Sequence, residues 1–213
     1  MPQDALGGAP ALRIGIMGGT FDPIHRAHLH NASRAASACG LDQVVLVPTG
    51  EPCHKDPRAV SPSADRFAMA AIACRPHPLL SVSRVELDRP GPSHTVPTLQ
   101  EFRRRLGPEA ELFLIVGTDT AEGMSQWHQA EAIPRLARLV VCGRADHVPD
   151  PGRLPRSGLY VPASPRPWRI SSTQIRARIR DGRPVRHLLP DGVAAYIAER
   201  GLYLDRAVHQ ESY

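Results

Sequence analysis

The chain has 213 residues, a length that suits one α/β domain with at most a short C-terminal addition. Charged residues make up 22% of it and hydrophobic residues 42%, and no apolar run approaches the roughly 20 residues of a membrane-spanning helix, so we expect no membrane partner. The net charge of +5 suits an anionic partner, but the basic residues are not interleaved with aromatics, which favours nucleotide phosphates over nucleic acid.

The N-terminus and the cysteines both indicate a cytoplasmic protein. The first residues lack the basic region and the apolar core of a signal peptide. The four cysteines are scattered and form no C-x-x-C pair, which is typical of reduced thiols rather than of disulfides or a zinc site. We expect a frayed or disordered leader over residues 1–11, a single domain over residues 12–204 and a tail over residues 205–213.

Short apolar runs alternate with helical stretches along the chain. The predicted strands are residues 12–17, 43–47, 80–85, 112–116, 138–142 and 159–161. The predicted helices are residues 27–39, 63–74, 95–106, 172–180 and 193–200. This alternation predicts an α/β fold with a Rossmann-like, doubly wound parallel sheet, in a single domain with a small C-terminal helical part.

The first loop at the carboxyl edge of this sheet has features of a phosphate site. Ligands of such sheets bind beyond the carboxyl ends of the strands. Gly18 and Gly19 let backbone N–H groups approach an anion without a Cβ in the way, and the following helix points its N-terminal amides to the same place. His25 and His28 can project together toward a phosphate. Separately, the glycines indicate only a turn and the histidines only a surface pair, and the loop is neither a Walker A nor a dinucleotide motif.

A second polar segment starts the helix near the C-terminus. It reads Ile-Ser-Ser-Thr-Gln-Ile-Arg over residues 170–176. Ser171 or Ser172 caps the helix, Thr173 adds a further hydroxyl, and Arg176 can offer a fork of donors to phosphate oxygens. The plainer interpretation is a capping sequence with a solvated arginine.

Together the two segments resemble the signatures of the adenylyltransferases, relatives of the class I aminoacyl-tRNA synthetases. Residues 18–28 are similar to G-G-T-F-D-P-x-H-x-G-H, and residues 170–176 to I-S-S-T-x-I-R, in the expected order. The resemblance implies that ATP is bound by the following residues: Gly18, Gly19, Thr20, Phe21, His25, His28, Gly117, Asp119, Ser171, Ser172, Thr173 and Arg176.

Other segments resemble the bacterial nicotinate-mononucleotide adenylyltransferases in particular, over about residues 12–204. Residues 48–55 are similar to their P-x-x-x-P-P-H-K loop, residues 92–95 to the P-S-Y-T segment that holds the nicotinate carboxylate, and residues 125–127 to the tryptophan segment on which the pyridine ring stacks. Residues 116–119 and 141–144 are similar to two nucleotide-binding strand ends. The implied acceptor-binding residues are His54, Lys55, His94, Thr95, Trp127 and Arg144.

Single residues from these segments also have plainer interpretations. Trp127 alone would indicate core packing, Asp119 a helix cap and Arg144 a solvated surface charge. Three positions depart from the family pattern. Ala27 replaces a glycine between the two histidines, His94 replaces a tyrosine and Cys53 replaces the second proline of the phosphate loop.

The resemblance implies transfer of AMP from ATP to nicotinate mononucleotide, giving nicotinate adenine dinucleotide and pyrophosphate. The catalytic residues would be His25 and His28 on the α- and β-phosphates, with Lys55 and Arg176 holding the triphosphate and the leaving pyrophosphate. Lys55 is the only lysine of the chain. Mg²⁺ would arrive with ATP, bound mainly through phosphates and water, because no carboxylate cluster forms a dedicated protein site.

Several alternatives remain open. A sibling enzyme would use nicotinamide mononucleotide or phosphopantetheine, or would transfer CMP to a polyol phosphate. A nucleotide sensor would keep the fold without catalysis, and a nucleic-acid-binding module would use the basic charge. The sequence leaves the oligomeric state open between a monomer and a homo-oligomer.

Overall fold

The computed structural model describes residues 11–53, 56, 59–143, 150, 158–164 and 170–204. Three residues with predicted roles, His54, Lys55 and Arg144, lie outside the described residues. Their roles stay predictions, as do the domain boundaries and the oligomeric state.

The described strands form one parallel sheet in the order β3-β2-β1-β4-β5-β6. The strands are β1 (Arg13–Gly19), β2 (Gln43–Pro48), β3 (Leu80–Val82), β4 (Glu111–Gly117), β5 (Arg138–Cys142) and β6 (Leu159–Val161). The prediction of a Rossmann-like, doubly wound sheet is confirmed. The strand order reverses between β1 and β4, which is where ligands of this fold bind.

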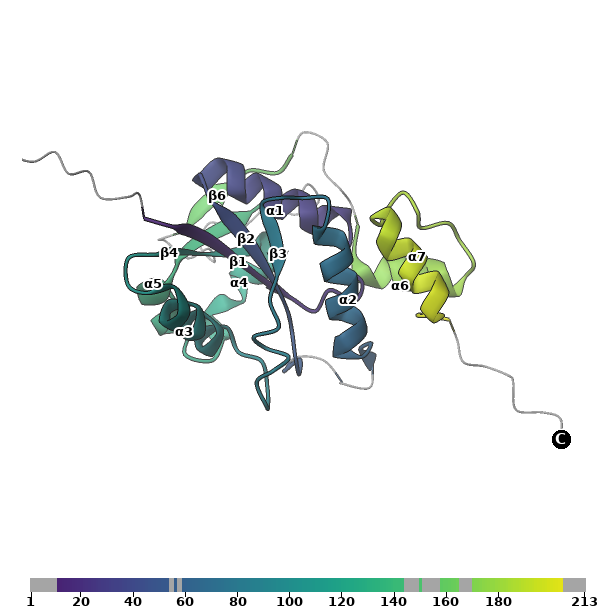
Figure 1. The fold of residues 1–213 in the computed structure, drawn as a ribbon, viewed down its shortest axis with the longest axis horizontal. Helices are drawn as coiled ribbons and strands as arrows, with labels where there is room; N and C mark the ends of the chain where they lie inside the picture. Colours follow the sequence, from purple (N-terminus) through teal and green to yellow (C-terminus); the bar gives the residue numbers. More distant parts are fainter. Residues whose placement is uncertain are drawn as a thin grey trace, which may run out of the picture.

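Helices cover both faces of the sheet (Figure 1). The helices of the described residues are α1 (Arg26–Cys39), α2 (Ser63–Cys74), α3 (Thr95–Leu106), α4 (Thr118–Glu122), η2 (Met124–Gln126), η3 (Ala130–Ala132), α5 (Ile133–Leu136), α6 (Ser172–Arg180) and α7 (Asp191–Arg200). Helices α1 and α2 lie on one face and α3 and α5 on the other, while α6 and α7 lie together beyond α2.

Alternate side chains of each strand enter two separate hydrophobic cores. In β4, Phe113 and Ile115 pack on the side of α1 and α2, and Leu112, Leu114 and Val116 pack on the side of α3. Because both faces are covered, the strands are apolar throughout rather than alternating. Burial of each such side chain stabilises the fold by about 1.5–3 kcal/mol.

The structure differs from the sequence prediction mainly between β4 and β5. Residues 118–136 contain α4, η2, η3 and α5, none of which was predicted, because helices of three to five residues are too short to show a helical period. Strand β3 ends at Val82 instead of residue 85, because the chain turns away from the sheet there. Helix α7 begins at Asp191 instead of residue 193.

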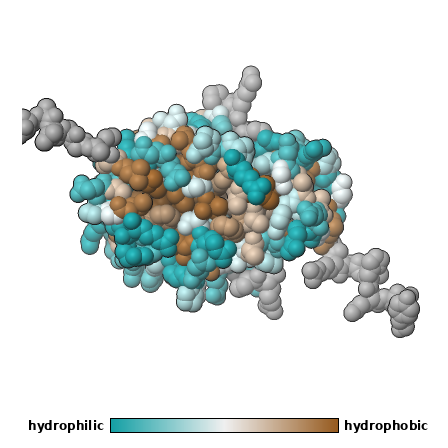
Figure 2. Space-filling model, viewed as in Figure 1, coloured by the Kyte–Doolittle hydropathy of each residue, from teal (hydrophilic) through white to brown (hydrophobic). Residues whose placement is uncertain are grey.

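The surface seen in Figure 2 is hydrophobic over the strands between α1 and α3, mixed over α2 and hydrophilic over α3. In the part of the chain that the structure describes, no helix is both long enough and apolar enough to cross a bilayer.

Candidate active site

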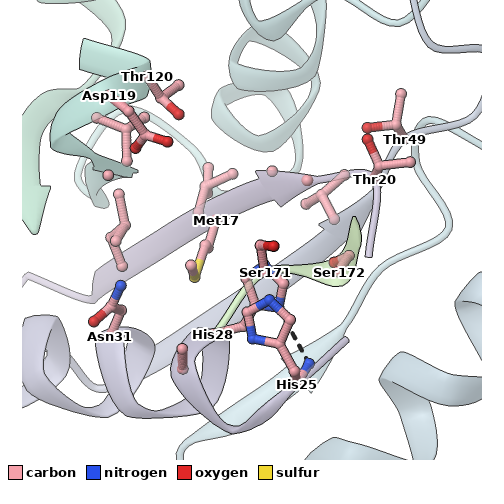
Figure 3. A pocket seen from close by; sticks show the side chains of 18 of the residues that line it. Met17, Thr20, His25, His28, Asn31, Thr49, Asp119, Thr120, Ser171 and Ser172 are labelled. Atoms are coloured by element: carbon pink, nitrogen blue, oxygen red, sulfur yellow. Dashed lines mark hydrogen bonds between the residues drawn. The ribbon is translucent and has the colours of Figure 1, made fainter. Parts of the chain in front are cut away.

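A cavity of about 530 Å³ opens at the carboxyl ends of β1 and β4, where the strand order reverses. Figure 3 shows that residues from both ends of the chain meet in it. The predicted site residues that line it are Gly18, Gly19, Thr20, His25, His28, Thr95, Gly117, Asp119, Trp127, Ser171, Ser172, Thr173 and Arg176. Two predicted residues that the structure describes, Phe21 and His94, do not line the cavity.

The loop after β1 is shaped by a phenylalanine that lies behind it. Phe21 is 2% exposed and adopts a φ of 51°, in the left-handed region that few non-glycine residues occupy. A Cβ on Gly19 would lie 3.0 Å from the Phe21 ring, whereas a Cβ on Gly18 would meet nothing within 4 Å. Gly19 therefore makes room for the ring, and Gly18 leaves the cavity side of the strand end open. Phe21 supports the loop from behind rather than lining the cavity.

The two histidines form a stacked pair at the start of α1 (Figure 3). Their ring centroids are 3.7 Å apart and their planes differ by 17°. The backbone N–H of His25 donates to Nδ1 of His28 over 3.2 Å. This bond needs an unprotonated Nδ1, so the neutral His28 ring carries its proton on Nε2. The Phe21 and His28 rings pack in a T-shaped arrangement, with centroids 5.1 Å apart and planes at 88°, which further fixes the orientation of the His28 ring.

The substitution of Ala27 for glycine leaves the start of this helix intact. Helix α1 begins at Arg26, directly after the extended His25, and Ala27 packs against the core beneath α1 while also lining the cavity. The stacked histidines are therefore compatible with a Cβ between them.

The two sequence motifs are joined by hydrogen bonds. Arg176 Nη1 donates to the backbone carbonyl of Asp22 over 2.8 Å, and Ser172 Oγ donates to that of Pro23 over 2.9 Å. Ser171 caps α6 with Gln174 as its partner, since each side chain bonds the other's backbone N–H. The start of α6 is thereby fixed against the loop that precedes the histidines.

A buried arginine holds the same loop from the other side, and the sequence analysis did not single it out. Arg66 is 1% exposed and donates to the carbonyls of Thr20 and Ser61, over 2.9 Å each, and of Gly50, over 3.1 Å. Burial lowers its pKa, and the nearby Asp22 carboxylate opposes that shift. The sequence did offer a signal for Arg66. It lies on the apolar face of α2, because the residues three, four and seven positions after it are buried.

Asp22 connects this loop to the C-terminal segment of the described chain. Its carboxylate is 3% exposed and accepts the Tyr203 hydroxyl over 2.7 Å and the Ser61 N–H over 3.3 Å. Burial raises the pKa of Tyr203, and the Asp22 carboxylate raises it further, so the phenol stays protonated and donates. The loop between β1 and α1 is thus held by side chains from α2, α6 and the segment after α7.

The end of β4 supplies a carboxylate to the cavity. Asp119 lies in the first turn of α4 and lines the cavity (Figure 3). A Cβ on Gly117 would lie 2.8 Å from Asp119 Oδ1, so glycine is needed for the carboxylate to fold back over the strand end. Asp119 is not the cap of α4, because the N-cap is Gly117 and no side chain bonds it, so the plainer interpretation of Asp119 as a helix cap is wrong.

The other end of the cavity is built from α3 and the segments around it. Trp127 is half-buried: part of it packs against the core on the α3 side and part lines the cavity, so packing and a ring platform are compatible. The His94 side chain contacts the His128 ring, with centroids 4.6 Å apart. Glu86, Ser93 and Thr98 also line this end, and the sequence analysis named none of them as site residues.

Among the described residues, no group of three or more His, Cys, Asp or Glu side chains could hold a metal ion. The prediction that Mg²⁺ is bound with ATP, mostly through phosphates and water, stays a prediction.

Comparisons with known proteins agree with this architecture. The cytidylyltransferase-like family model matches residues 16–178. A protein of Saccharopolyspora erythraea named "probable nicotinate-nucleotide adenylyltransferase" is 44% identical over 191 residues, covering 90% of this chain and 89% of that protein. A protein of Thermus thermophilus with the same name is 44% identical over 192 residues, covering 90% and 100%. The solved structure of Plasmodium falciparum nicotinic acid mononucleotide adenylyltransferase with NaAD matches with a TM-score of 0.75, over 90% of this chain and 97% of that one. Its 18% identity supports the fold alone.

Proposed function

The chain belongs to the nicotinate-nucleotide adenylyltransferases of the cytidylyltransferase-like family, and we propose that it transfers AMP from ATP to nicotinate mononucleotide. The products are nicotinate adenine dinucleotide and pyrophosphate, a step of NAD biosynthesis. The observation that carries the proposal is the junction of the two motifs: the stacked histidines and Arg176 meet on one cavity, whose other end holds Trp127 and the start of α3.

The reaction needs alignment and charge stabilisation rather than a general base. An oxygen of the acceptor phosphate is already anionic, and it forms a bond to the α-phosphorus of ATP while the bond from that phosphorus to the bridging oxygen breaks. The bridging oxygen leaves with the electron pair as part of pyrophosphate. The enzyme must hold these atoms in line and neutralise the charge that develops on the phosphate oxygens.

The histidine pair is suited to that task. Because Nδ1 of His28 accepts a backbone N–H, Nε2 of its ring carries the hydrogen that can be donated to a phosphate oxygen. The N-terminus of α1 adds the positive end of its dipole, and there is no acidic residue in its first turn. Arg176 gives one N–H to the Asp22 carbonyl and one, over 3.4 Å, to Thr173 Oγ1, and retains further donors, since a guanidinium has five N–H groups. We assign it, with Lys55, to the triphosphate.

The acceptor end suits a planar ring that carries an anion. Trp127 offers an aromatic face to the pyridine, and the first turn of α3 offers backbone N–H groups to its carboxylate. Phosphopantetheine has neither feature. We therefore place nicotinate mononucleotide ahead of that acceptor and of nicotinamide mononucleotide, with His54 and Arg144 as further proposed contacts.

We also propose that the enzyme acts in the cytoplasm on MgATP. All four cysteines are free thiols, which suits a reducing compartment. The Mg²⁺ ion would bridge phosphate oxygens of ATP and keep water in its remaining positions. Neither a nucleic acid nor a membrane is needed for this reaction.

The test is pyrophosphate release from MgATP with nicotinate mononucleotide, nicotinamide mononucleotide and phosphopantetheine in parallel reactions. We expect the highest kcat/KM with nicotinate mononucleotide. Release with phosphopantetheine alone would contradict the acceptor while preserving the reaction type. No release with any acceptor would favour a nucleotide sensor.

A further inference from the structure

Glu86 is a buried acid on the acceptor side of the cavity to which the reaction assigns no step. It lies in the turn that follows β3, it is 7% exposed, and it lines the cavity. A buried carboxylate is costly unless hydrogen-bond donors compensate for the lost water. The residues that donate hydrogen bonds to Glu86 therefore show which segment it stabilises.

Both donors come from the segment that starts α3. Thr98 Oγ1 donates to Glu86 Oε1 over 2.7 Å, and the Ser93 side chain also bonds Glu86. Ser93 Oγ already accepts the backbone N–H of Gly50 over 3.0 Å, so its hydroxyl proton is available for the carboxylate. Ser93 precedes α3 and Thr98 lies in its first turn, so Glu86 ties down both sides of the helix start.

Further bonds make this arrangement rigid. Arg89 Nη2 donates to Thr98 Oγ1 over 3.1 Å and to the His94 carbonyl over 3.4 Å. Thr98 Oγ1 accepts from Arg89 and has one proton of its own to donate. Two acceptors are within reach of that proton: Glu86 Oε1 at 2.7 Å and the His94 carbonyl at 3.2 Å. The shorter distance favours Glu86. The Ser93 N–H donates to the carbonyl of Glu51 over 2.9 Å, which joins the segment to the loop after β2.

The charges around Glu86 suit an accepting carboxylate. Burial raises its pKa, while the Thr98 and Ser93 hydroxyls and the guanidinium groups of Arg89 and Arg66 lower it. Both hydroxyls need an oxygen of Glu86 that accepts, and Oε1 is the oxygen that accepts from Thr98.

The held segment is the one that offers donors to the acceptor. The first N–H groups of an α-helix have no partner within the helix. Pro97 has no N–H group, so the first turn of α3 offers the N–H groups of Thr95 and Val96. Thr95 lines the cavity. A shift of about 1 Å in this turn would misplace both donors relative to a bound carboxylate.

We propose that Glu86 is a positioning residue of the acceptor subsite: by accepting the Ser93 and Thr98 hydroxyls, it holds the start of α3 in the geometry that selects an acceptor with a ring carboxylate. The proposal rests on the proposed function, because it concerns the same cavity. Glu86 itself is not required to touch either substrate.

The experiment compares the KM values for nicotinate mononucleotide and for ATP in four variants. Glu86→Gln keeps the size of the side chain but replaces one carboxylate oxygen with an NH₂ group. That group cannot accept a hydrogen bond from a hydroxyl. We expect its KM for nicotinate mononucleotide to rise about tenfold, the effect of one lost buried hydrogen bond, with kcat and the KM for ATP within about threefold of wild type. Thr98→Val should do the same, and Thr98→Ser, which keeps the hydroxyl, should match wild type.

The matched control is Asp65→Asn. Asp65 is also a buried acid, 5% exposed, and accepts the Tyr196 hydroxyl over 2.7 Å, but it lies away from the cavity lining. This variant should lose thermal stability and keep both KM values. If Glu86→Gln does not fold, the comparison of Thr98→Val with Thr98→Ser tests the proposal by itself.

Three results would overturn the proposal: an unchanged KM for nicotinate mononucleotide in Glu86→Gln, an equal rise in both KM values, or no difference between Thr98→Val and Thr98→Ser. Failure of the proposed function looks different, because wild type itself would then give no dinucleotide from nicotinate mononucleotide, and the role of Glu86 would fall with it.

Discussion

The two ends of the cavity are built in different ways. The end that we assign to the nucleotide is a loop of glycines and histidines. Side chains from three distant segments hold it: the buried Arg66 and the half-buried Arg176 and Tyr203. The acceptor end is a helix start and a half-buried tryptophan, held by the Glu86 bonds and by short helices. A loop held at several points suits in-line phosphate chemistry, which depends on close alignment, whereas the acceptor end would determine which acceptor binds. Substitutions should therefore separate into those that affect turnover and those that affect only the acceptor.

The largest expected effect is at the nucleotide end. His28→Ala should lower kcat by at least about 100-fold, because it removes a preorganised donor to the phosphate that develops charge. Steady-state kinetics and thermal unfolding measure activity and folding separately. His187→Ala, at an exposed position away from the cavity, should match wild type. Near-normal turnover of folded His28→Ala would remove His28 from the mechanism.

A matched pair of tyrosines tests how the nucleotide loop is held. Tyr203→Phe removes the 2.7 Å bond to Asp22 and should lower the free energy of unfolding by about 2 kcal/mol, as expected for a partly buried hydrogen bond to a carboxylate. It should also lower kcat. Tyr196→Phe removes an equally short bond to Asp65 but should leave kcat unchanged. Denaturant unfolding and kinetics of both variants distinguish the two roles. Equal kcat values for the pair would show that Tyr203 contributes only stability.

Trp127→Ala should affect the acceptor end alone. We expect a rise of about tenfold in the KM for nicotinate mononucleotide, since an aromatic contact contributes about 0.5–1.5 kcal/mol beyond its buried area. The affinity for ATP, measured by calorimetry without acceptor, should stay within about threefold of wild type. A comparable loss of ATP affinity would mean that Trp127 supports the whole cavity rather than one end.

The smallest expected effect is a pH dependence at the acceptor end. Burial raises the pKa of Glu86 in the folded state, so the folded protein binds more protons than the unfolded chain between the ordinary and the raised pKa values. The stability of wild type relative to Glu86→Gln should therefore fall as pH rises from about 4 through the raised pKa. Urea unfolding of both proteins across this range measures the difference. A gap in unfolding free energy that does not change with pH would contradict the raised pKa.

The sequence could predict the strands, the long helices and the two motifs for a physical reason. Strands buried on both faces are apolar throughout, and Ser171 with Gln174 is a capping pair that marks a helix start by itself. The position of the cavity also followed, because the carboxyl edge of a doubly wound sheet is where ligands bind.

The supporting residues could not be predicted in the same way. Arg66 and Thr20 are far apart in sequence, and so are Tyr203 and Asp22, so these bonds depend on how α2 and the segment after α7 pack. Glu86 lies in the turn after β3, whereas the predicted strand continued to residue 85, directly before Glu86. Phe21 was assigned to the nucleotide on a resemblance, but its left-handed backbone places the ring behind His28.

The most direct test offers purified enzyme MgATP together with equal concentrations of nicotinate mononucleotide, nicotinamide mononucleotide and phosphopantetheine, and identifies the adenylylated products by mass spectrometry. We predict nicotinate adenine dinucleotide as the main product, formed in a one-to-one ratio with pyrophosphate. Adenylylated phosphopantetheine as the main product, or pyrophosphate without any dinucleotide, would contradict the assignment.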